Sequence, residues 1–407
     1  MTDAVRGLGL VACLVLVPTL TVCSLAQSGS RAVAEPATAA TAAWVYVQIQ
    51  GPQGSVYGFR ASSTGRLSPI PGSPFKPAGE IVGATPTKFF TLGKTLIHSY
   101  GISSDGAIQS QLSQIPVFDY SGSECTSSTS TAQQGAVLDH TGKYIYVLLE
   151  CGGDELSAEY QSYIIHSDGA FSYDGDTSLP AYWSDGGYVP YLPSILGNER
   201  FAYADESGVH GQSVPIGFRR EANGTLELMQ FAESGPTSGY CYEDYTANSP
   251  DASPVGNYVV LQLYPCNTNP PQFGSYTVAS NGNISTTNTS SNMPRSSLVE
   301  PHTTFSPSGD LFVAYSDSGG DGIEIYKFNG AAPLTLWQTL LTGEGIAQVA
   351  FDRSNHLYAI NGENKLYVFT VTPTSVTEDS AISIGSPFKM VVVSERSERA
   401  LTTGELQ

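Results

Sequence analysis

Residues 299–328 read VEPHTTFSPSGDLFVAYSDSGGDGIEIYKF and form a repeating unit of strands and turns. Apolar, aromatic and β-branched residues fill His302–Phe305, Leu311–Tyr315 and Ile323–Phe328, and the last of these alternates apolar and polar side chains. This composition and a period of two indicate β-strands. A tight turn, Ser308-Gly309-Asp310, separates the first two strands. Three strands cannot bury their own faces, so the fold depends on whether the unit recurs.

The second strand of this unit recurs along the chain. Gly, Asn or Asp turns precede most copies, and hairpin turns such as Asn-Gly and Asp-Gly, which tolerate positive φ, follow most of them. A repeat of about 50 residues with four strands per copy is typical of a β-propeller. We therefore predict an all-β, seven-bladed β-propeller. Its second strands are predicted at Trp44–Gln50, Thr95–Gly101, Tyr144–Glu150, Arg200–Glu206, Tyr258–Tyr264, Leu311–Asp317 and Leu357–Glu363.

The two ends of the repeat region complement each other. The first copy begins directly with its second strand, Trp44–Gln50, whereas Lys389–Ser394 at the other end has no second strand after it. The motif Gly-Ser-Pro-Phe precedes this last strand at 385–388 and the inner strand of the second copy at 72–75. We expect Lys389–Ser394 to complete the first blade, because a closed ring leaves no sheet edge open.

The N-terminus has the features of an export signal. It contains Arg6, an apolar run from Leu8 to Leu20 and a small-residue cleavage site, Ser24-Leu25-Ala26. The apolar run is too short to span a membrane, which favours a signal peptide. The alternative is a lipoprotein signal that leaves a lipidated Cys23, although Val22 fits that signal poorly. Either alternative predicts an extracytoplasmic protein, periplasmic or secreted.

These features divide the chain into four parts. The segment before the first strand is rich in Ala, Thr and Pro, a composition typical of a flexible spacer. The predicted parts are a signal peptide at 1–26, a spacer at 27–43, the propeller at 44–394 and a C-terminal tail at 395–407.

Composition limits the partners. The chain of 407 residues carries a formal net charge of −19, which disfavours nucleic acid and anionic membrane surfaces. No P-loop, dinucleotide fingerprint, haem-attachment motif or G-x-S-x-G elbow occurs in the sequence. We therefore expect no nucleic-acid partner, no transmembrane segment, no cofactor and a monomer.

Four cysteines occupy equivalent places in two copies. Cys125 and Cys241 lie in loops that lead into a blade, and Cys151 and Cys266 lie at the ends of second strands. Both places are on one face of a propeller, so we predict the disulfides Cys125–Cys151 and Cys241–Cys266. No CxxC pair or nearby His accompanies these cysteines, which argues against a metal site.

The best-preserved copy resembles a known family. Pro301-His302, Phe305–Gly309, Phe312–Ala314 and Gly320–Ile323 followed by Tyr326 are similar to the repeat of the seven-bladed lactonase family, which includes propeller-type 6-phosphogluconolactonases and shares its repeat with YVTN surface proteins. The resemblance implies a seven-bladed fold over roughly 44–394 and, as an activity, lactone hydrolysis. The family pattern often has an Arg after the Asp where this chain has Asp321-Gly322, so a cation for a carboxylate substrate is missing here.

A layer of residues near the starts of the inner strands is the expected place of catalytic groups. Aligning the copies on His302 gives Pro86, Gly135, Leu192, Ser249, His302, Gln348 and Met390. Only His302 can ionise, whereas a hydrolase needs a base, an oxyanion stabiliser and usually an orienting partner. His302 is therefore the one catalytic candidate of this layer.

Acidic residues gather at the ends of the second strands. The long loops of the propeller lie on the same face, and long loops on a rigid scaffold commonly carry binding residues. Carboxylates suit a basic partner or Ca²⁺, but no EF-hand loop is present and we predict no metal. Aromatic loop residues such as Trp183 and Tyr191 suit stacking on a sugar or peptide. The predicted ligand-binding face comprises Glu150, Asp205, Glu206, His302, Asp317 and Gln348.

Two functional hypotheses follow. The incomplete polar set favours a non-catalytic scaffold at the cell envelope that binds a small molecule, a glycan or a protein. The family resemblance favours, as the alternative, a lactonase-like hydrolase of a sugar-acid lactone. An Arg or a carboxylate within about 4 Å of His302 would favour the enzyme, because catalytic groups act within hydrogen-bond reach.

Overall fold

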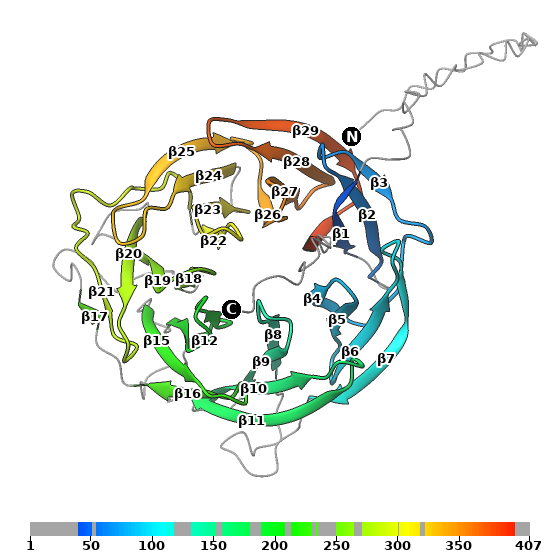
Figure 1. Ribbon diagram of the computed structural model, residues 1–407, viewed down its shortest axis with the longest axis horizontal. Coiled ribbons are helices and arrows are strands. Elements are labelled where there is room, and N and C mark those ends of the chain that lie inside the picture. Colours follow the sequence, from blue (N-terminus) through cyan, green and yellow to red (C-terminus); the bar gives the residue numbers. More distant parts are fainter. Residues whose placement is uncertain are drawn as a thin grey trace, which may run out of the picture. The chain divides into compact units, whose positions relative to one another are not determined.

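The structure is a computed structural model with strands from Thr41 to Ser394. It describes residues 40–50, 54–117, 132–151, 157–179, 189–207, 213–229, 233–234, 250–263, 271–299, 301–317 and 322–394. These residues form seven sheets arranged around one axis (Figure 1). The predicted all-β, seven-bladed propeller is confirmed. None of the described residues belongs to a helix that could cross a membrane.

Five blades are four-stranded antiparallel sheets, numbered in chain order from the N-terminus. From the axis outward, blade 1 consists of β30 (Pro387–Ser394), β1 (Thr41–Ile49), β2 (Val56–Ser62) and β3 (Leu67–Pro69). Blade 2 consists of β4 (Glu80–Thr85), β5 (Lys88–Leu92), β6 (Leu96–Ile102) and β7 (Ile108–Pro116). Blade 3 consists of β8 (Ala132–Leu138), β9 (Tyr144–Cys151), β10 (Ser157–Ile165) and β11 (Phe171–Leu179). Blade 6 consists of β22 (His302–Phe305), β23 (Leu311–Ser316), β24 (Gly322–Lys327) and β25 (Thr335–Leu340). Blade 7 consists of β26 (Ile346–Phe351), β27 (His356–Asn361), β28 (Lys365–Val371) and β29 (Val376–Ser383).

Blades 4 and 5 depart from this pattern at their sheet edges. In blade 4 two short strands both pair with the second strand, so the blade consists of β12 (Val189–Pro190), β13 (Ser194–Ile195), β14 (Phe201–Ser207), β15 (Ser213–Arg220) and β16 (Leu226–Met229). Blade 5 has a two-residue inner strand and an extra outer strand, and consists of β18 (Asp251–Ala252), β19 (Tyr258–Leu263), β20 (Gln272–Val278), β21 (Ile284–Ser285) and β17 (Glu233–Ser234).

The ring closes as predicted. The last strand, β30, pairs antiparallel with β1, so that Trp44 lies opposite Val393 and Val47 opposite Met390. In Figure 1 the red end of the chain therefore lies beside the blue beginning within one sheet. Blade 1 thus takes its inner strand from one end of the chain and its other three strands from the other end.

The second strand of blade 2 was assigned wrongly from the sequence. The structure places Thr95–Gly101 largely within β6, the third strand, whereas the second strand is β5. The cause is the turn Leu92-Gly93-Lys94, which resembles the turns before second strands but here joins the second and third strands by a short connection. Pro86 consequently lies in the turn between β4 and β5 and not in the layer of His302.

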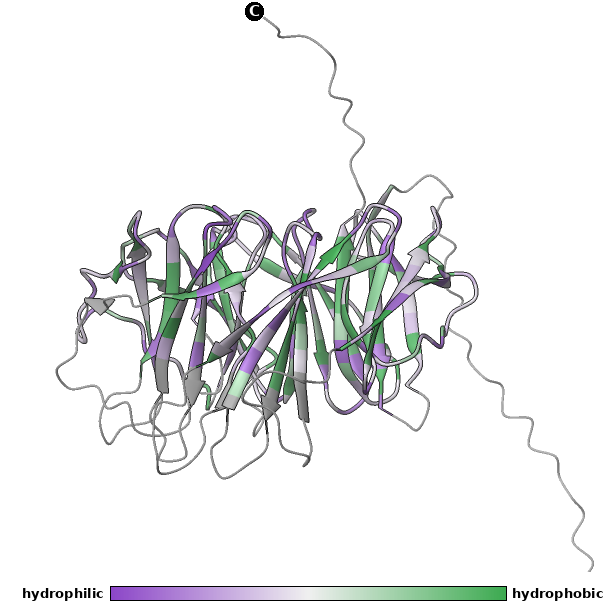
Figure 2. Cartoon of the chain, turned by 90° about the horizontal axis from the view of Figure 1, so that it is seen from below, coloured by the Kyte–Doolittle hydropathy of each residue, from purple (hydrophilic) through white to green (hydrophobic). Residues whose placement is uncertain are grey.

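The hydrophobic core is divided among the seven interfaces between blades. Each apolar cluster of described residues combines side chains from two neighbouring sheets, and the cluster between blades 7 and 1 includes Met390 of the closing strand. Figure 2 shows hydrophobic stretches, in green, along the strands of adjacent blades. Burial of apolar area at these interfaces is the main stabilising contribution, at roughly 25 cal/mol per Å².

Neighbouring blades are also joined by a recurring hydrogen bond. A hydroxyl of one blade donates to the carbonyl of the hairpin glycine between the third and fourth strands of the next. Within the described part of the chain, this bond joins six of the seven pairs of neighbouring blades: Tyr46 to Gly106, Ser99 to Gly169, Tyr146 to Gly224, Tyr203 to Gly282, Ser275 to Gly330 and Ser380 to Gly65. Each bond fixes one sheet relative to the next.

The hairpin glycines are required by both conformation and space. Gly106 has φ +86°, and a Cβ atom there would lie 2.5 Å from the Trp44 ring of the preceding blade. Gly224 has φ +99°, and its Cβ would lie 2.0 Å from the Tyr144 ring. Asp-Gly and Asn-Gly in the sequence therefore indicate close blade packing as well as a hairpin turn.

We expect Tyr46→Phe to lower the free energy of unfolding by about 1–3 kcal/mol, because the buried Gly106 carbonyl loses its donor. Urea denaturation measures this change. Tyr57→Phe is the control: Tyr57 is partly exposed, and its hydroxyl bonds to none of the described residues. Equal stability of Tyr46→Phe and wild type would show that the hydroxyl does not hold the two blades together.

Candidate functional site

Ionisable side chains near the axis come from the inner strands of blades 5 and 6 and from the second strand of blade 6. β18 and β22 lie next to each other, and β23 follows β22 in blade 6. We call this group the axial site. It comprises Asp251, His302, Thr303, Tyr315 and Asp317.

Asp251 is the most perturbed acid of the axial site. Its carboxylate accepts a hydrogen bond from the hydroxyl of Thr303, which comes from the neighbouring blade. The other carboxylate oxygen, Oδ2, is inaccessible to solvent and accepts no hydrogen bond. Burial raises the pKa of Asp251 to about 6, and the Thr303 bond opposes this shift only in part. A buried carboxylate oxygen without a donor is costly and marks a functional candidate.

His302 is packed against an aromatic ring. Its imidazole stacks on Tyr315, the residue opposite it on β23, with a centroid distance of 5.4 Å and an interplanar angle of 21°. Burial lowers the pKa of His302, and the charge of Asp317 opposes this effect. The imidazole is therefore neutral at pH 7. No carboxylate of a described residue lies within 4.0 Å of it, so the proximity expected of an enzyme is not met by a direct ion pair.

Tyr315 connects the groups of the axial site. Burial raises its pKa, and the charges of Asp251 and Asp317 raise it further. Its hydroxyl accepts a hydrogen bond from the backbone of Val349 in blade 7. Tyr315 is therefore a neutral phenol that fixes the orientation of His302 from a position shared by blades 6 and 7.

Some members of the predicted layer around His302 contact a neighbouring blade. Gln348 uses its Oε1 to accept a hydrogen bond of 2.6 Å from the Met390 backbone N–H, which joins blades 7 and 1. A Cβ atom on Gly135 would lie 3.4 Å from Leu192, which joins blades 3 and 4. Ser249 lies outside the described residues, and Pro86 is not in the layer. Gln348 thus has a structural contact, and His302 is the layer's ionisable member.

The other predicted face residues are dispersed over different blades. Asp205 on β14 is buried, and Asp317 directly after β23 is exposed. Glu150 on β9 and Glu206 on β14 are placed by their backbone pairing with Ala132 and Pro190. Asp317 is electrostatically coupled to His302.

The predicted disulfides lie outside the part of the chain that the structure describes. This applies to Cys125, Cys241 and Cys266, and of Cys151 the structure describes only its backbone position at the end of β9. Trp183 also lies outside this part. The disulfides therefore stay predictions. Among the described residues, no group of three or more His, Cys, Asp or Glu side chains is arranged to hold a metal ion.

Asp251 was not identified from the sequence, although a signal was present. It lies two residues before Ser253, which begins the turn between the inner and second strands of blade 5. The same position in blades 3, 4, 6, 7 and 1 holds Val137, Ser194, Thr304, Ala350 and Val392. These copies have small or apolar residues at this position. The acid in blade 5 therefore indicates a role in one place and not a role in the structure of every blade.

The axial site combines two groups that suit acid–base chemistry near neutrality. Asp251 has a pKa raised toward the working range of a general base, and His302 is held neutral. Environments that push a carboxyl upward and an imidazole downward are typical of catalytic pairs. The arrangement can accept a proton at Asp251 and donate a hydrogen bond from His302.

Comparisons with known proteins bear on the fold. No protein-family profile matches the sequence, and no curated protein matches it. Among solved structures, the chain is similar to the periplasmic gluconolactonase of Pseudomonas aeruginosa, with 14% identity, a TM-score of 0.57 and coverage of 86% of this chain and 99% of that one. A proposed 6-phosphogluconolactonase of Bacteroides uniformis gives 14% identity, a TM-score of 0.62 and coverage of 87% and 100%. A second proposed 6-phosphogluconolactonase, from Bacteroides fragilis, gives 15% identity, a TM-score of 0.59 and coverage of 88% of this chain and 99% of that one. The chain therefore has the seven-bladed fold of these proteins.

We expect Asp251→Asn to stabilise the protein at pH 7 but not at pH 4. The folded state raises the Asp251 pKa above its ordinary value, so it binds the proton more firmly than the unfolded state and loses stability as the pH rises from about 4 to about 6. At pH 7 the neutral amide removes a cost of up to about 3 kcal/mol, since one pKa unit corresponds to about 1.4 kcal/mol. Urea denaturation at both pH values measures the difference. A stability change that is the same at pH 4 and pH 7 would contradict a raised pKa of the buried Asp251 carboxylate.

Proposed function

We propose that the protein is an extracytoplasmic lactone hydrolase whose reaction takes place at the axial site. The observation that carries this proposal is the Asp251 carboxylate, which has a buried oxygen without a hydrogen-bond donor and a pKa raised to about 6. Its strand, β18, neighbours β22, which carries the neutral His302. The shared fold with a periplasmic gluconolactonase supports the reaction class and the compartment.

The charges of the axial site favour a neutral substrate. Asp251 and Asp317 both act on Tyr315, so the site carries negative charge, and no described Lys or Arg makes an ion pair with either acid. A phosphorylated lactone would be repelled. Phosphorylated sugars also belong to the cytoplasm, whereas the N-terminal sequence predicts export. We therefore assign an unphosphorylated sugar-acid lactone as the substrate class.

The reaction is a proton-assisted addition of water. The Asp251 carboxylate accepts a proton from a water molecule as the water oxygen bonds to the lactone carbonyl carbon. The ring C–O bond then breaks, and the departing oxygen takes the proton from Asp251, which leaves a hydroxy acid and a regenerated carboxylate. The neutral His302 ring donates a hydrogen bond to the carbonyl oxygen, where negative charge develops. Tyr315 is a positioning residue, because it acts by stacking on His302.

A non-catalytic binding scaffold is the second candidate. It is favoured by the absence, among the described residues, of a carboxylate within 4.0 Å of His302 to orient the ring. A scaffold would bind a sugar lactone or its acid at the axial site without converting it. The two candidates therefore differ in turnover and not in the location of the site.

The enzyme hypothesis is tested by measuring the hydrolysis of a panel of lactones, including gluconolactone, in a pH-stat. The rates are corrected for spontaneous hydrolysis. We expect Asp251→Asn to lower kcat/KM by about 10²–10⁴-fold, as for loss of a general base. His302→Gln should lower it by about 10²–10³-fold, as for loss of an oxyanion donor. Wild-type kcat/KM should fall below pH 6, because the base becomes protonated.

Glu363→Gln is the matched control for this assay. Glu363 is an exposed carboxylate shortly after the second strand of blade 7, on the face where the axial site lies, and its substitution should leave kcat/KM unchanged. Equal and negligible rates for wild type and all variants would remove the enzyme hypothesis in favour of the scaffold. Full activity of Asp251→Asn would exclude Asp251 as the base.

A further inference from the structure

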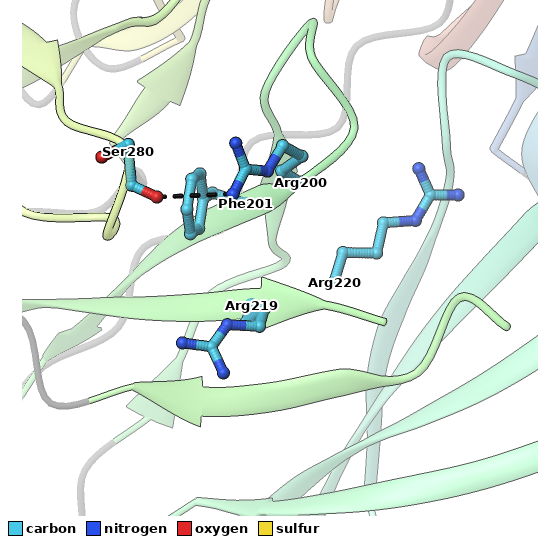
Figure 3. Close-up of a pocket in the computed structure, with 5 residues that line it drawn as sticks. All are labelled: Arg200, Phe201, Arg219, Arg220 and Ser280. Atoms are coloured by element: carbon cyan, nitrogen blue, oxygen red, sulfur yellow. Dashed lines mark hydrogen bonds between the residues drawn. The ribbon is translucent and has the colours of Figure 1, made fainter. Parts of the chain in front are cut away.

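The sheets contain a second candidate site, formed by residues that do not belong to the axial site. A cavity of about 280 Å³ lies between blades 4 and 5, near the turn that leads into β14 and the hairpin that ends β20. We call it the arginine cavity. It is lined by Arg200, Phe201, Arg219, Arg220 and Ser280 (Figure 3).

The arginine cavity concentrates positive charge in an acidic chain. Between Lys143 and Arg295 the sequence contains only three Lys or Arg residues, and all three line this cavity. The net charge of the chain is −19, so a general requirement for solubility does not explain the clustering. Three guanidinium groups around one cavity are typical of a site for an oxyanion.

Arg220 has a structural role in this group. Its side chain is buried, and its Nη2 lies 2.8 Å from Asp139 Oδ2 in blade 3. Its Nη1 lies 3.6 Å from Glu199 Oε2, and its guanidinium lies over the Tyr144 ring at 4.5 Å. Figure 3 shows Arg220 and Arg219, neighbours on β15, extending in opposite directions. The charge of Arg220 is therefore balanced by the carboxylates that it contacts.

Arg200 has donors available for a ligand. Its guanidinium lies 5.4 Å from the centroid of the Phe201 ring, and its Nη2 donates a hydrogen bond of 3.4 Å to the Ser280 carbonyl in blade 5 (Figure 3). No ion pair joins Arg200 to a carboxylate of any described residue. A guanidinium has five N–H donors, so most of those of Arg200 are free to face an anion.

Arg219 can exchange its present partner at little cost. It forms an ion pair of 3.2 Å with Glu227, and the two side chains are 55% and 59% exposed. Exposed ion pairs of this kind contribute about 0–1 kcal/mol to stability. A ligand oxyanion that bridges Arg200 and Arg219 would therefore compete with a weak internal contact.

We propose that the arginine cavity binds a small oxyanion, a carboxylate or a phosphate, between the guanidinium groups of Arg200 and Arg219. The Arg200 guanidinium packs on the Phe201 ring and donates a hydrogen bond to the Ser280 carbonyl, and these two contacts orient it. The arginine cavity shares no lining residue with the axial site, so substitutions at Arg200 and Arg219 test anion binding separately from lactone hydrolysis.

Isothermal titration at low ionic strength with inorganic phosphate, and separately with sodium gluconate, tests the proposal. We expect saturable one-site binding of at least one probe, and the probe that binds identifies phosphate or carboxylate as the ligand group. Arg200→Gln and Arg219→Gln should each weaken that binding about tenfold or more, because each removes a charge-assisted hydrogen bond. Added salt should weaken it as well.

Arg353→Gln is the matched control. Arg353 is an exposed arginine in the turn between β26 and β27, on the same face of the ring but in blade 7. Its loss should change the affinity less than twofold. Thermal unfolding of each variant verifies that the fold is retained. Absence of saturable binding of both probes, or an equal weakening by Arg353→Gln, would overturn the proposal.

Discussion

The structure depends on the requirement that each sheet cover both of its apolar faces. A single blade has no interior, and the seven apolar clusters lie between blades and not within them. Every blade therefore needs a neighbour on both sides, which only a closed ring supplies. The hydroxyl-to-glycine hydrogen bonds add specific contacts to this packing, because each joins a side chain of one sheet to a hairpin carbonyl of the next.

The same packing creates the chemistry of the axial site. Asp251 occupies a strand position where other blades have small or apolar side chains, so its carboxylate lies in the low-dielectric space between two sheets. A solvated Asp would stay ionised and would be a weak base at neutral pH. Tight contact between blades 5 and 6 removes that solvation, and the interblade bond from Thr303 restores only part of it.

Features of the structure that recur in several blades could be predicted from the sequence. Strand alternation, hairpin glycines and the isolated last strand are shared by many copies, so the blade number and the ring closure could be inferred. Features that occur once were harder to find. The short connection at Gly93 shifted the assignment of blade 2, and Asp251 was missed because its role depends on contacts with Thr303 and Tyr315 in the next blade. His302 was selected from the sequence because it belongs to the best-preserved copy, and its role stays a prediction.

The pairing of β1 with β30 has a consequence for biosynthesis. Ribosomes and export channels deliver a chain from its N-terminus, so β1 emerges first and its partner emerges only after nearly all other strands. Until then β1 has an unpaired backbone edge, the kind of template that recruits wrong strands from other chains. Blade 1 is therefore completed last. Until then, chaperones of the compartment in which the chain folds would have to cover the open edge of β1.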